Sequence, residues 1–269
     1  MIRSCISSLA VVTAVALSSP ASADFPAEIA SAELLGGWLT PAGRHVAALK
    51  IKLSPGWKTY WRAPGDAGIP PAFDWSASRN VAAVTPMWPV PHVFWQNGMR
   101  SVGYAGEVIL PLDVTPARPG APVRLSGRID IGVCEDVCIP ISFDLSADLP
   151  QPGARDAAIT RAMEDRPASA EAAGVTSVTC AIAPIADGIR VEATVTMPRL
   201  GTDEAAVLEL PDPSVWISEA ATRRDGGTLV ATADMVPPNG RPFAVDRSDV
   251  RITVLSGTRG VDIQGCTGR

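Results

Sequence analysis

The feature that most limits the fold is the shortness of the ordered segments, because proline and glycine interrupt the chain throughout. The 269 residues include 25 prolines and 23 glycines, which end helices and mark turns. Between these turns lie short runs of alternating or continuous apolar residues, each long enough for one strand. Clear examples are residues 45–53, 107–114, 123–133 and 138–149. The pattern leaves room for few long helices and predicts an all-β protein.

One segment departs from this pattern. Residues 152–167 are rich in alanine, place apolar residues at helical spacing and end at a proline, so we expect a short helix there. Strands resume after it, beginning with a hairpin that has an Asp-Gly turn. We therefore expect two immunoglobulin-like β-sandwich domains, at residues 24–151 and 168–269, joined by this linker helix.

The N-terminal residues 1–23 are typical of a secretory signal peptide. Arg3 gives a basic start, a short apolar run follows, and small residues at 21–23 form a cleavage site. The apolar run is too short for a membrane span, and no later segment approaches the necessary length. We expect a mature protein that begins at Asp24, is exported to the periplasm and has no stable membrane insertion.

Composition excludes several classes of partner. The chain is 46% hydrophobic and 19% charged, with a net charge of −5, which does not favour nucleic acid or anionic lipid. The glycines do not form a phosphate-binding pattern, and we expect no cofactor. His45 and His92 are the only histidines, too few for a zinc site built with the cysteines, so no metal site is predicted.

The mature chain retains four cysteines, Cys134, Cys138, Cys180 and Cys266. An oxidising compartment permits two disulfides among them. Three connectivities are possible, and the simplest joins 134 to 138 and 180 to 266. The second bridge would close a loop of about 86 residues and stabilise the fold by roughly 4–5 kcal/mol on the chain-entropy model. We therefore interpret Cys180–Cys266 as a structural disulfide.

The pair at 134 and 138 lies in the stretch RIDIGVCEDVCIPISFDL. Alternation along the two flanking strands predicts that both cysteines lie on the polar side, beside a three-residue turn and away from the core. A bridge that closes so short a loop removes little chain entropy, whereas an exposed sulfur is open to attack by an external thiolate. The sequence therefore favours thiol–disulfide exchange over a local staple or a Cu(I) site, which remain open.

Two of the three residues between these cysteines are acidic. Glu135 and Asp136 place negative charge beside the sulfurs, and nearby carboxylates raise the pKa of a thiol. A raised thiol pKa disfavours the reduced form relative to the disulfide. The turn therefore predicts a bias toward a reductant.

Three stretches in order resemble a known family. Residues 56–75 (GWKTYWRAPGDAGIPPAFDW), 88–114 (WPVPHVFWQNGMRSVGYAGEVILPLDV) and 131–140 (IGVCEDVCIP) are similar to the periplasmic N-terminal region of DsbD-type thiol:disulfide interchange proteins. The three-residue spacing between the cysteines matches the ScsB branch, which is linked to copper tolerance. The resemblance is strong over about residues 30–150.

The resemblance implies an immunoglobulin-like domain that carries electrons. A membrane-embedded thiol reductant of the CcdA/DsbD kind would reduce the pair, which would pass the electrons to periplasmic thioredoxin-like proteins. By resemblance, Cys138 forms the mixed disulfide and Cys134 resolves it. Phe94 or Trp95 would be a lid over the pair, and Tyr60 an aromatic residue near it.

Family members usually continue into membrane helices and a thioredoxin domain, so this chain would need a separate membrane donor. The alternative is a non-enzymatic periplasmic module that binds copper or a partner, with both disulfides structural.

Overall fold

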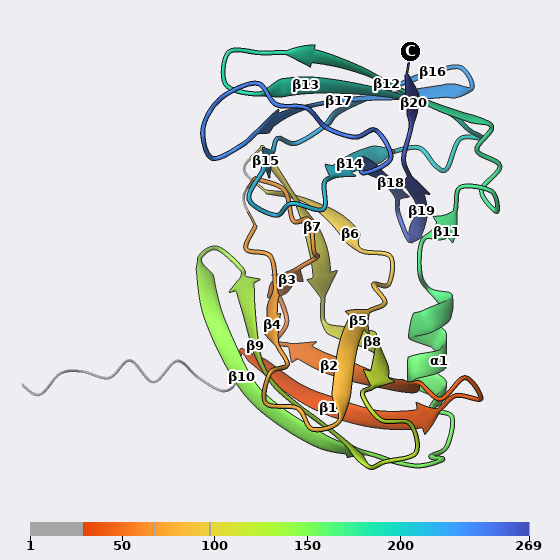
Figure 1. Cartoon of the computed structure of the whole chain (residues 1–269). Helices are drawn as coiled ribbons and strands as arrows, with labels where there is room; N and C mark the ends of the chain where they lie inside the picture. Colours follow the sequence, from red (N-terminus) through yellow and green to blue (C-terminus); the bar gives the residue numbers. More distant parts are fainter. Residues whose placement is uncertain (1–28, 67, 97, 269) are drawn as a thin grey trace, which may run out of the picture.

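The computed structural model describes residues 29–66, 68–96 and 98–268 (Figure 1). These residues form four β-sheets and a helix, α1 (Ala157–Glu164). The prediction of an all-β protein with immunoglobulin-like sandwiches joined by a short helix is confirmed. The predicted signal peptide lies outside the described residues. Within the described ranges, none of the helical structure is long and apolar enough to cross a membrane.

Two sheets form the first half of the chain. One has the order β1-β2-β8-β5 and the other the order β10-β9-β3-β7-β6, with β4 paired to β9. Their strands are β1 (Ala30–Leu39), β2 (His45–Leu53), β3 (Lys58–Tyr60), β4 (Ala72–Asp74), β5 (Val81–Pro86), β6 (His92–Gln96), β7 (Met99–Ala105), β8 (Glu107–Pro116), β9 (Val123–Cys134) and β10 (Cys138–Leu149). The pairings are antiparallel.

The second half also has two sheets, in which the pairings β11–β19 and β12–β20 are parallel. One sheet has the order β11-β19-β18-β14 and the other the order β15-β17-β13-β12-β20, with β16 paired to β17. Their strands are β11 (Ala168–Ser169), β12 (Ser177–Pro184), β13 (Ile189–Thr196), β14 (Ala205–Glu209), β15 (Trp216–Ile217), β16 (Ala221–Asp225), β17 (Thr228–Val236), β18 (Arg251–Ser256), β19 (Arg259–Gln264) and β20 (Thr267–Gly268). The domain boundaries given above stay predictions.

The linker helix is shorter than the predicted span of 152–167. Its first turn is capped by Asp156, whose Oδ1 accepts hydrogen bonds from the backbone N of Ala158 (2.7 Å) and of Ile159 (3.0 Å). A side-chain cap of this kind fixes where a helix begins. Ile159 is fully buried against Trp38 and its neighbours on the outer face of the β1-β2-β8-β5 sheet, so the helix is part of the first half's packing.

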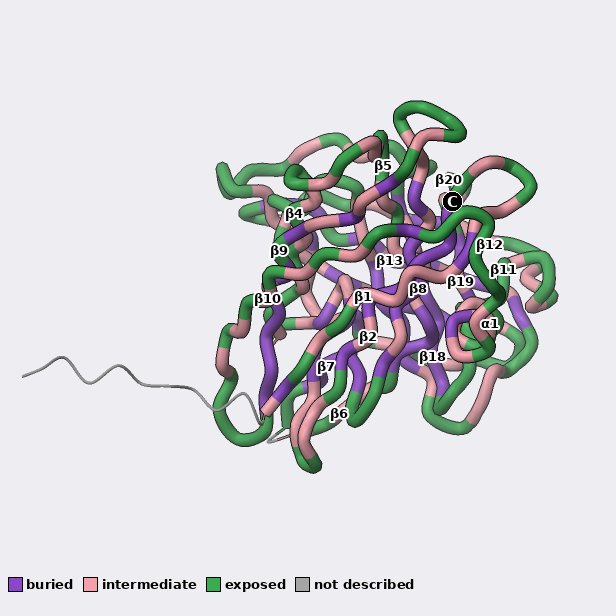
Figure 2. The backbone as a smooth tube through the Cα atoms, turned by 90° about the horizontal axis from the view of Figure 1, so that it is seen from below, coloured by how far each residue is buried: buried purple, intermediate pink, exposed green. Residues whose placement is uncertain are grey.

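Buried apolar residues form a core cluster in each half, and Figure 2 colours the buried residues purple along the backbone. Burying such surface stabilises a fold by about 25 cal/mol per Å². The core of the first half also includes Val207 and Leu255 from the second half. The two halves are therefore joined by apolar contact as well as by the chain.

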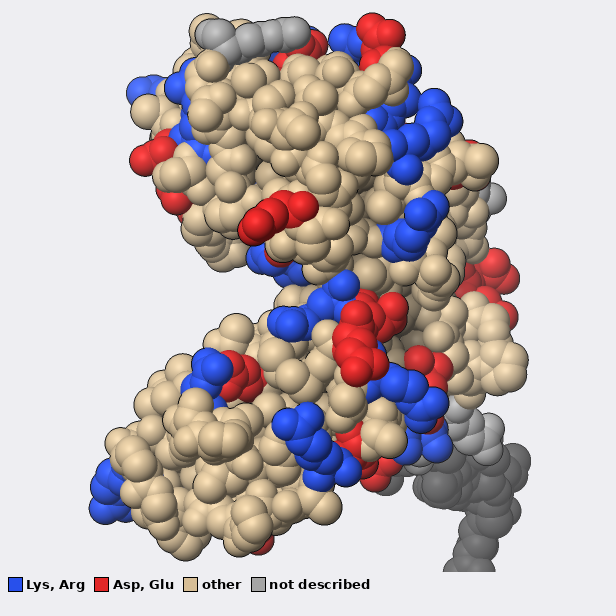
Figure 3. Space-filling view, turned by 90° about the vertical axis from the view of Figure 1, so that its right-hand side faces the viewer, with Lys and Arg blue, Asp and Glu red and all other residues tan. Residues whose placement is uncertain are grey.

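Two arginines of the first half reach the second. Arg62 donates to both carboxylate oxygens of Glu209, at 2.8 and 2.9 Å. Arg100, only 5% exposed, donates to the carbonyl of Ala206 (3.3 Å) and lies 3.3 Å from the carboxylate of Glu219. Figure 3 shows the resulting shape, with two lobes and a hollow between them.

Candidate functional site

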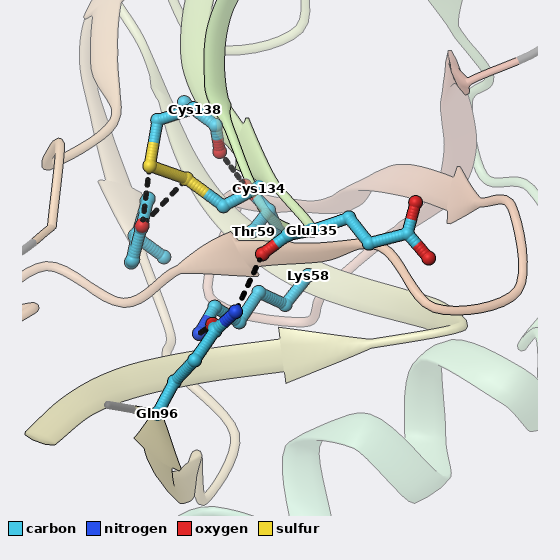
Figure 4. The surroundings of a disulfide bond; sticks show 8 residues. Lys58, Thr59, Gln96, Cys134, Glu135 and Cys138 are labelled. Carbon is cyan, nitrogen blue, oxygen red and sulfur yellow. Dashed lines mark hydrogen bonds between the residues drawn. A yellow bond between two sulfur atoms is a disulfide. The ribbon is translucent and has the colours of Figure 1, made fainter. Parts of the chain in front are cut away.

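The candidate site lies at the tip of the longest hairpin. Strands β9 and β10 pair from Val123 and Leu149 at one end to Cys134 and Cys138 at the other. The two cysteines are direct partners, with Cα atoms 4.2 Å apart, and form a disulfide (Figure 4). The three-residue turn between them is exposed. Local alternation thus places the pair at a hairpin end, where the sequence predicted it.

The two sulfurs differ in access. Cys134 is 2% exposed, whereas Cys138 is exposed. The prediction that both cysteines lie open on the polar side is therefore wrong for Cys134. A Cβ added at Gly132, two residues earlier on the same face, would lie 2.7 Å from Ile69 and 3.2 Å from the ring of Tyr60. Side chains from distant segments cover this end of the face, which strand parity cannot reveal.

Tyr60 is the aromatic residue in contact with the disulfide. Its hydroxyl donates to Sγ of Cys134 at 2.7 Å and lies 3.2 Å from Sγ of Cys138. The side chain is positioned by β3, which pairs with β9 on one side and β7 on the other. Thr59 strengthens this pairing by donating to the carbonyl of Gly132 at 2.9 Å. Burial raises the pKa of Tyr60, so its hydroxyl keeps the proton that it donates to sulfur.

A second set of contacts holds the turn from the side of β6. Gln96 donates from Nε2 to the carbonyl of Glu135 at 3.0 Å, and Lys58 donates from Nζ to Oε1 of Gln96 at 2.9 Å. The Lys58 ammonium also lies 5.5 Å from the centre of the Phe94 ring, a cation–π contact. Burial lowers the pKa of Lys58. The cysteine turn is thus tied to the end of the β6–β7 hairpin.

The two aromatic residues predicted as a lid lie on β6. Phe94 is half-buried under Lys58. Trp95 is 66% exposed and lines a groove of about 350 Å³ together with Lys58, Gln96 and Glu135. Both residues are therefore near the cysteine turn, while the direct sulfur contact comes from Tyr60. A lid role for Phe94 or Trp95 stays a prediction.

The acidic turn is asymmetric. The carboxylate of Glu135 lies against Gly56 and points away from the disulfide (Figure 4). Gly56 has φ +88°, a backbone conformation that favours glycine, and a Cβ there would meet this carboxylate. Asp136 is exposed at the tip. The effect of the acidic turn on the thiol pKa stays a prediction.

The sequence interpretation missed four contributors: Lys58, Ile69, Gln96 and Gly132. One of them carries a recognisable signal, because glycine inside a strand marks a close approach by another group. Gly132 stands two residues before Cys134 in the middle of an otherwise apolar run. That position could have indicated that the face beside the cysteine is covered.

The second disulfide lies in the other half. Cys180 on β12 is fully buried and is bonded to Cys266, with Cα atoms 5.8 Å apart. Arg247 donates to the carbonyl of Cys180 at 3.3 Å. The bridge fixes the end of the chain to its sheet, and its purely structural role stays a prediction. Among the residues that the structure describes, no three His, Cys, Asp or Glu side chains are grouped to hold a metal ion.

Together, a half-exposed disulfide, a hydroxyl on its sulfurs and a tethered turn define a thiol:disulfide interchange module on an immunoglobulin-like domain. Comparison with known proteins supports this class. Residues 37–150 match the family model described as "Thiol:disulfide interchange protein DsbD, N-terminal". The match spans less than half of the chain, and it contains the whole cysteine hairpin.

A solved structure extends the likeness to the second half. The N-terminal periplasmic domain of ScsB from Proteus mirabilis has a TM-score of 0.66 and 21% sequence identity, covering 89% of this chain and 92% of that chain. At this identity the likeness concerns the fold. No curated protein matches by sequence. The two matches support a DsbD/ScsB N-terminal domain, so the resemblance predicted from the motifs is confirmed.

Proposed function

We propose that this protein is an extracytoplasmic electron relay that exchanges disulfides through Cys134 and Cys138. It takes electrons from a membrane-embedded thiol reductant and passes them to thioredoxin-like proteins. The observation that carries the proposal is the difference between the two sulfurs: Cys138 is exposed, and Cys134 is buried under the Tyr60 hydroxyl. An external thiolate can reach one sulfur, and the other is positioned to leave and return.

The chemistry consists of two half-reactions, and each transfers two electrons: the donor reduces the cysteine pair, and the pair then reduces the acceptor. A donor thiolate attacks Sγ of Cys138, the disulfide breaks, and Cys134 leaves as a thiolate that accepts the Tyr60 hydrogen bond. The donor's second thiol then displaces Cys138, so the donor becomes a disulfide and the pair becomes two thiols. In the second half-reaction the Cys138 thiolate attacks the acceptor's disulfide. Cys134 resolves the mixed disulfide and the acceptor is released as a dithiol.

The compartment follows from the same reasoning. A disulfide that cycles between partners needs surroundings in which disulfides persist, and the N-terminal sequence is typical of an export signal. The matched solved structure is itself described as a periplasmic domain. These points support a periplasmic location for the relay.

A pair of single substitutions tests the proposal. Cys134→Ser leaves the exposed thiol without its resolving partner, so incubation with an oxidised thioredoxin-like protein should trap a mixed disulfide on a non-reducing gel. Cys138→Ser is the matched control: it leaves only the buried thiol, and trapping should be at least tenfold weaker, in line with the dependence of exchange on sulfur access.

Equal trapping by both variants would contradict the assignment of Cys138 as the attacking residue. A wild-type pair that glutathione and dithiothreitol both fail to reduce in the folded protein would contradict the relay itself. In that case the pair would be a local staple.

A further inference from the structure

The exposed apolar side chains of this protein gather around the cysteine pair. In the described part of the chain, the large hydrophobic side chains that stand exposed are Ile69, Trp95, Met99, Val137 and Trp216. Single exposed apolar residues are ordinary on a protein surface, but a contiguous group marks an interaction site. We call these five residues the apolar collar.

Four members of the collar lie in the cysteine turn or near it. Val137, 69% exposed, is in the turn between the cysteines. Ile69 packs over Gly132 beside Tyr60. Trp95 lines the groove that also contains Glu135, and Met99 is the strand partner of Gln96, which is bonded to the turn.

The fifth member comes from the second half. Trp216, 51% exposed, lies on the short edge strand β15. It lines a cavity of about 390 Å³ whose other wall includes Gly68 and Pro70, the two neighbours of Ile69. Figure 1 shows β15, the β6–β7 turn and the β9–β10 tip on the same side of the molecule. Trp216 therefore extends the collar across the junction between the halves.

Some charges around the collar are held in contacts, whereas Asp136 in the turn between the cysteines is exposed. The Lys58 ammonium is bonded to Gln96, and the Glu135 carboxylate lies against Gly56. In the second half, the carboxylate of Glu209 accepts two hydrogen bonds from Arg62 of the first half. A partner that approaches Cys138 thus meets the apolar collar together with the exposed Asp136.

We infer that the apolar collar is the docking surface for the thiol partner and that Trp216 of the second half is one of its anchors. The inference rests on the proposed function. The occupant is a protein whose reactive cysteine lies on an apolar surface, because such a surface can bring a thiolate to Cys138 while covering Ile69, Val137 and Trp216. The second half is then part of partner recognition as well as a structural support.

Rates of exchange with a large and a small thiol test the inference. Oxidised wild-type protein and Trp216→Ala are each mixed with reduced thioredoxin and, separately, with dithiothreitol, and loss of the 134–138 disulfide is followed by alkylation. Truncating a tryptophan anchor should slow exchange with thioredoxin roughly tenfold or more. The rate with dithiothreitol should be unchanged, because a small thiol needs no docking surface. Trp216→Phe keeps an apolar ring and should restore most of the thioredoxin rate.

The outcomes separate this inference from the proposed function. A disulfide that dithiothreitol cannot reduce would overturn the relay. A normal dithiothreitol rate combined with equal thioredoxin rates for wild type and Trp216→Ala would overturn the docking role alone, as would a wild type that reacts with dithiothreitol and not with thioredoxin. A wild type that sediments as a dimer, with Trp216→Ala monomeric, would assign the collar to a second copy and also overturn it.

Discussion

A single hydroxyl group contacts both sulfurs of the pair. Tyr60 donates to the buried sulfur at 2.7 Å, and hydrogen bonds to a charged group are worth about 1.5–3 kcal/mol. Burial raises the pKa of this hydroxyl above its usual range, whereas thiols titrate near 8.5. The hydroxyl therefore remains a donor over the whole pH range in which the thiolates form. It stabilises the Cys134 thiolate at the moment when the disulfide opens.

Removing that hydroxyl should slow exchange without unfolding the protein. Tyr60→Phe keeps the ring against Gly132 and removes the donor, so reduction of the pair by dithiothreitol should be about tenfold slower, the factor that corresponds to about 1.4 kcal/mol. Stopped-flow measurement across pH 6–9 provides the test. Tyr104→Phe is the matched control, since the Tyr104 hydroxyl is also buried but donates to the carbonyl of Pro89. Equal slowing in both variants would contradict a role at sulfur.

At the scale of elements, the cysteine hairpin was predictable and its cover was not. Residues 138–149 form a strand with the predicted bounds, and β9 differs from the predicted 123–133 by one residue, because alternation is a local signal. Tyr60 contacts Cys134 and Ile69 packs over Gly132 on the same face, and both lie more than 60 residues from Cys134 in the sequence. Periodicity assigns a face to each residue, but long-range packing decides what covers that face.

A substitution on β9 should expose Cys134 by displacing the side chains that cover its face. In Gly132→Ala the new methyl group would lie 2.7 Å from Ile69, so the loop that carries Ile69 must move. Overpacking of this kind costs about 1–3 kcal/mol. We expect the reduced variant to be alkylated at both cysteines by a bulky maleimide, whereas reduced wild type reacts first at Cys138.

A second glycine on the same strand provides the comparison. A Cβ at Gly127 would lie 2.5 Å from Trp75, far from the cysteine end of the hairpin. Gly127→Ala should therefore lower the unfolding free energy by a similar amount and leave Cys134 protected. Protection of Cys134 in both variants would show that the Ile69 loop is not its cover.

At the scale of the whole molecule, the two halves are coupled by a partly buried ion pair. Arg62 and Glu209 have side chains that are each 15% exposed, and the Arg62 guanidinium also stacks 3.8 Å from the centre of the Trp61 ring. A buried ion pair adds little net stability, because the cost of removing two charges from water offsets their attraction. Removing one partner is destabilising, because it leaves the other charge unpaired. We therefore expect the pair to contribute to how the halves meet.

A double-mutant cycle measures this coupling. Arg62→Met should lower the unfolding free energy by about 3 kcal/mol, because the partly buried Glu209 loses both hydrogen bonds from the guanidinium. Arg62→Met combined with Glu209→Met should recover part of that loss, since neither member of the pair is left without the other. Chemical denaturation of the four proteins gives the interaction energy. A double variant as unstable as the sum of the two single variants would show that the ion pair does not couple the halves.

The unequal exposure of the two sulfurs also decides what peroxide does to the reduced protein. On the proposed function, we expect hydrogen peroxide to convert the outer thiolate to a sulfenic acid, which further oxidant would turn into an irreversible sulfinic acid. The inner thiol is already the strand partner of that sulfur, and its attack expels water and closes the disulfide. We therefore expect the sulfenic acid to be converted to the disulfide, so that peroxide oxidises the reduced pair without inactivating the protein.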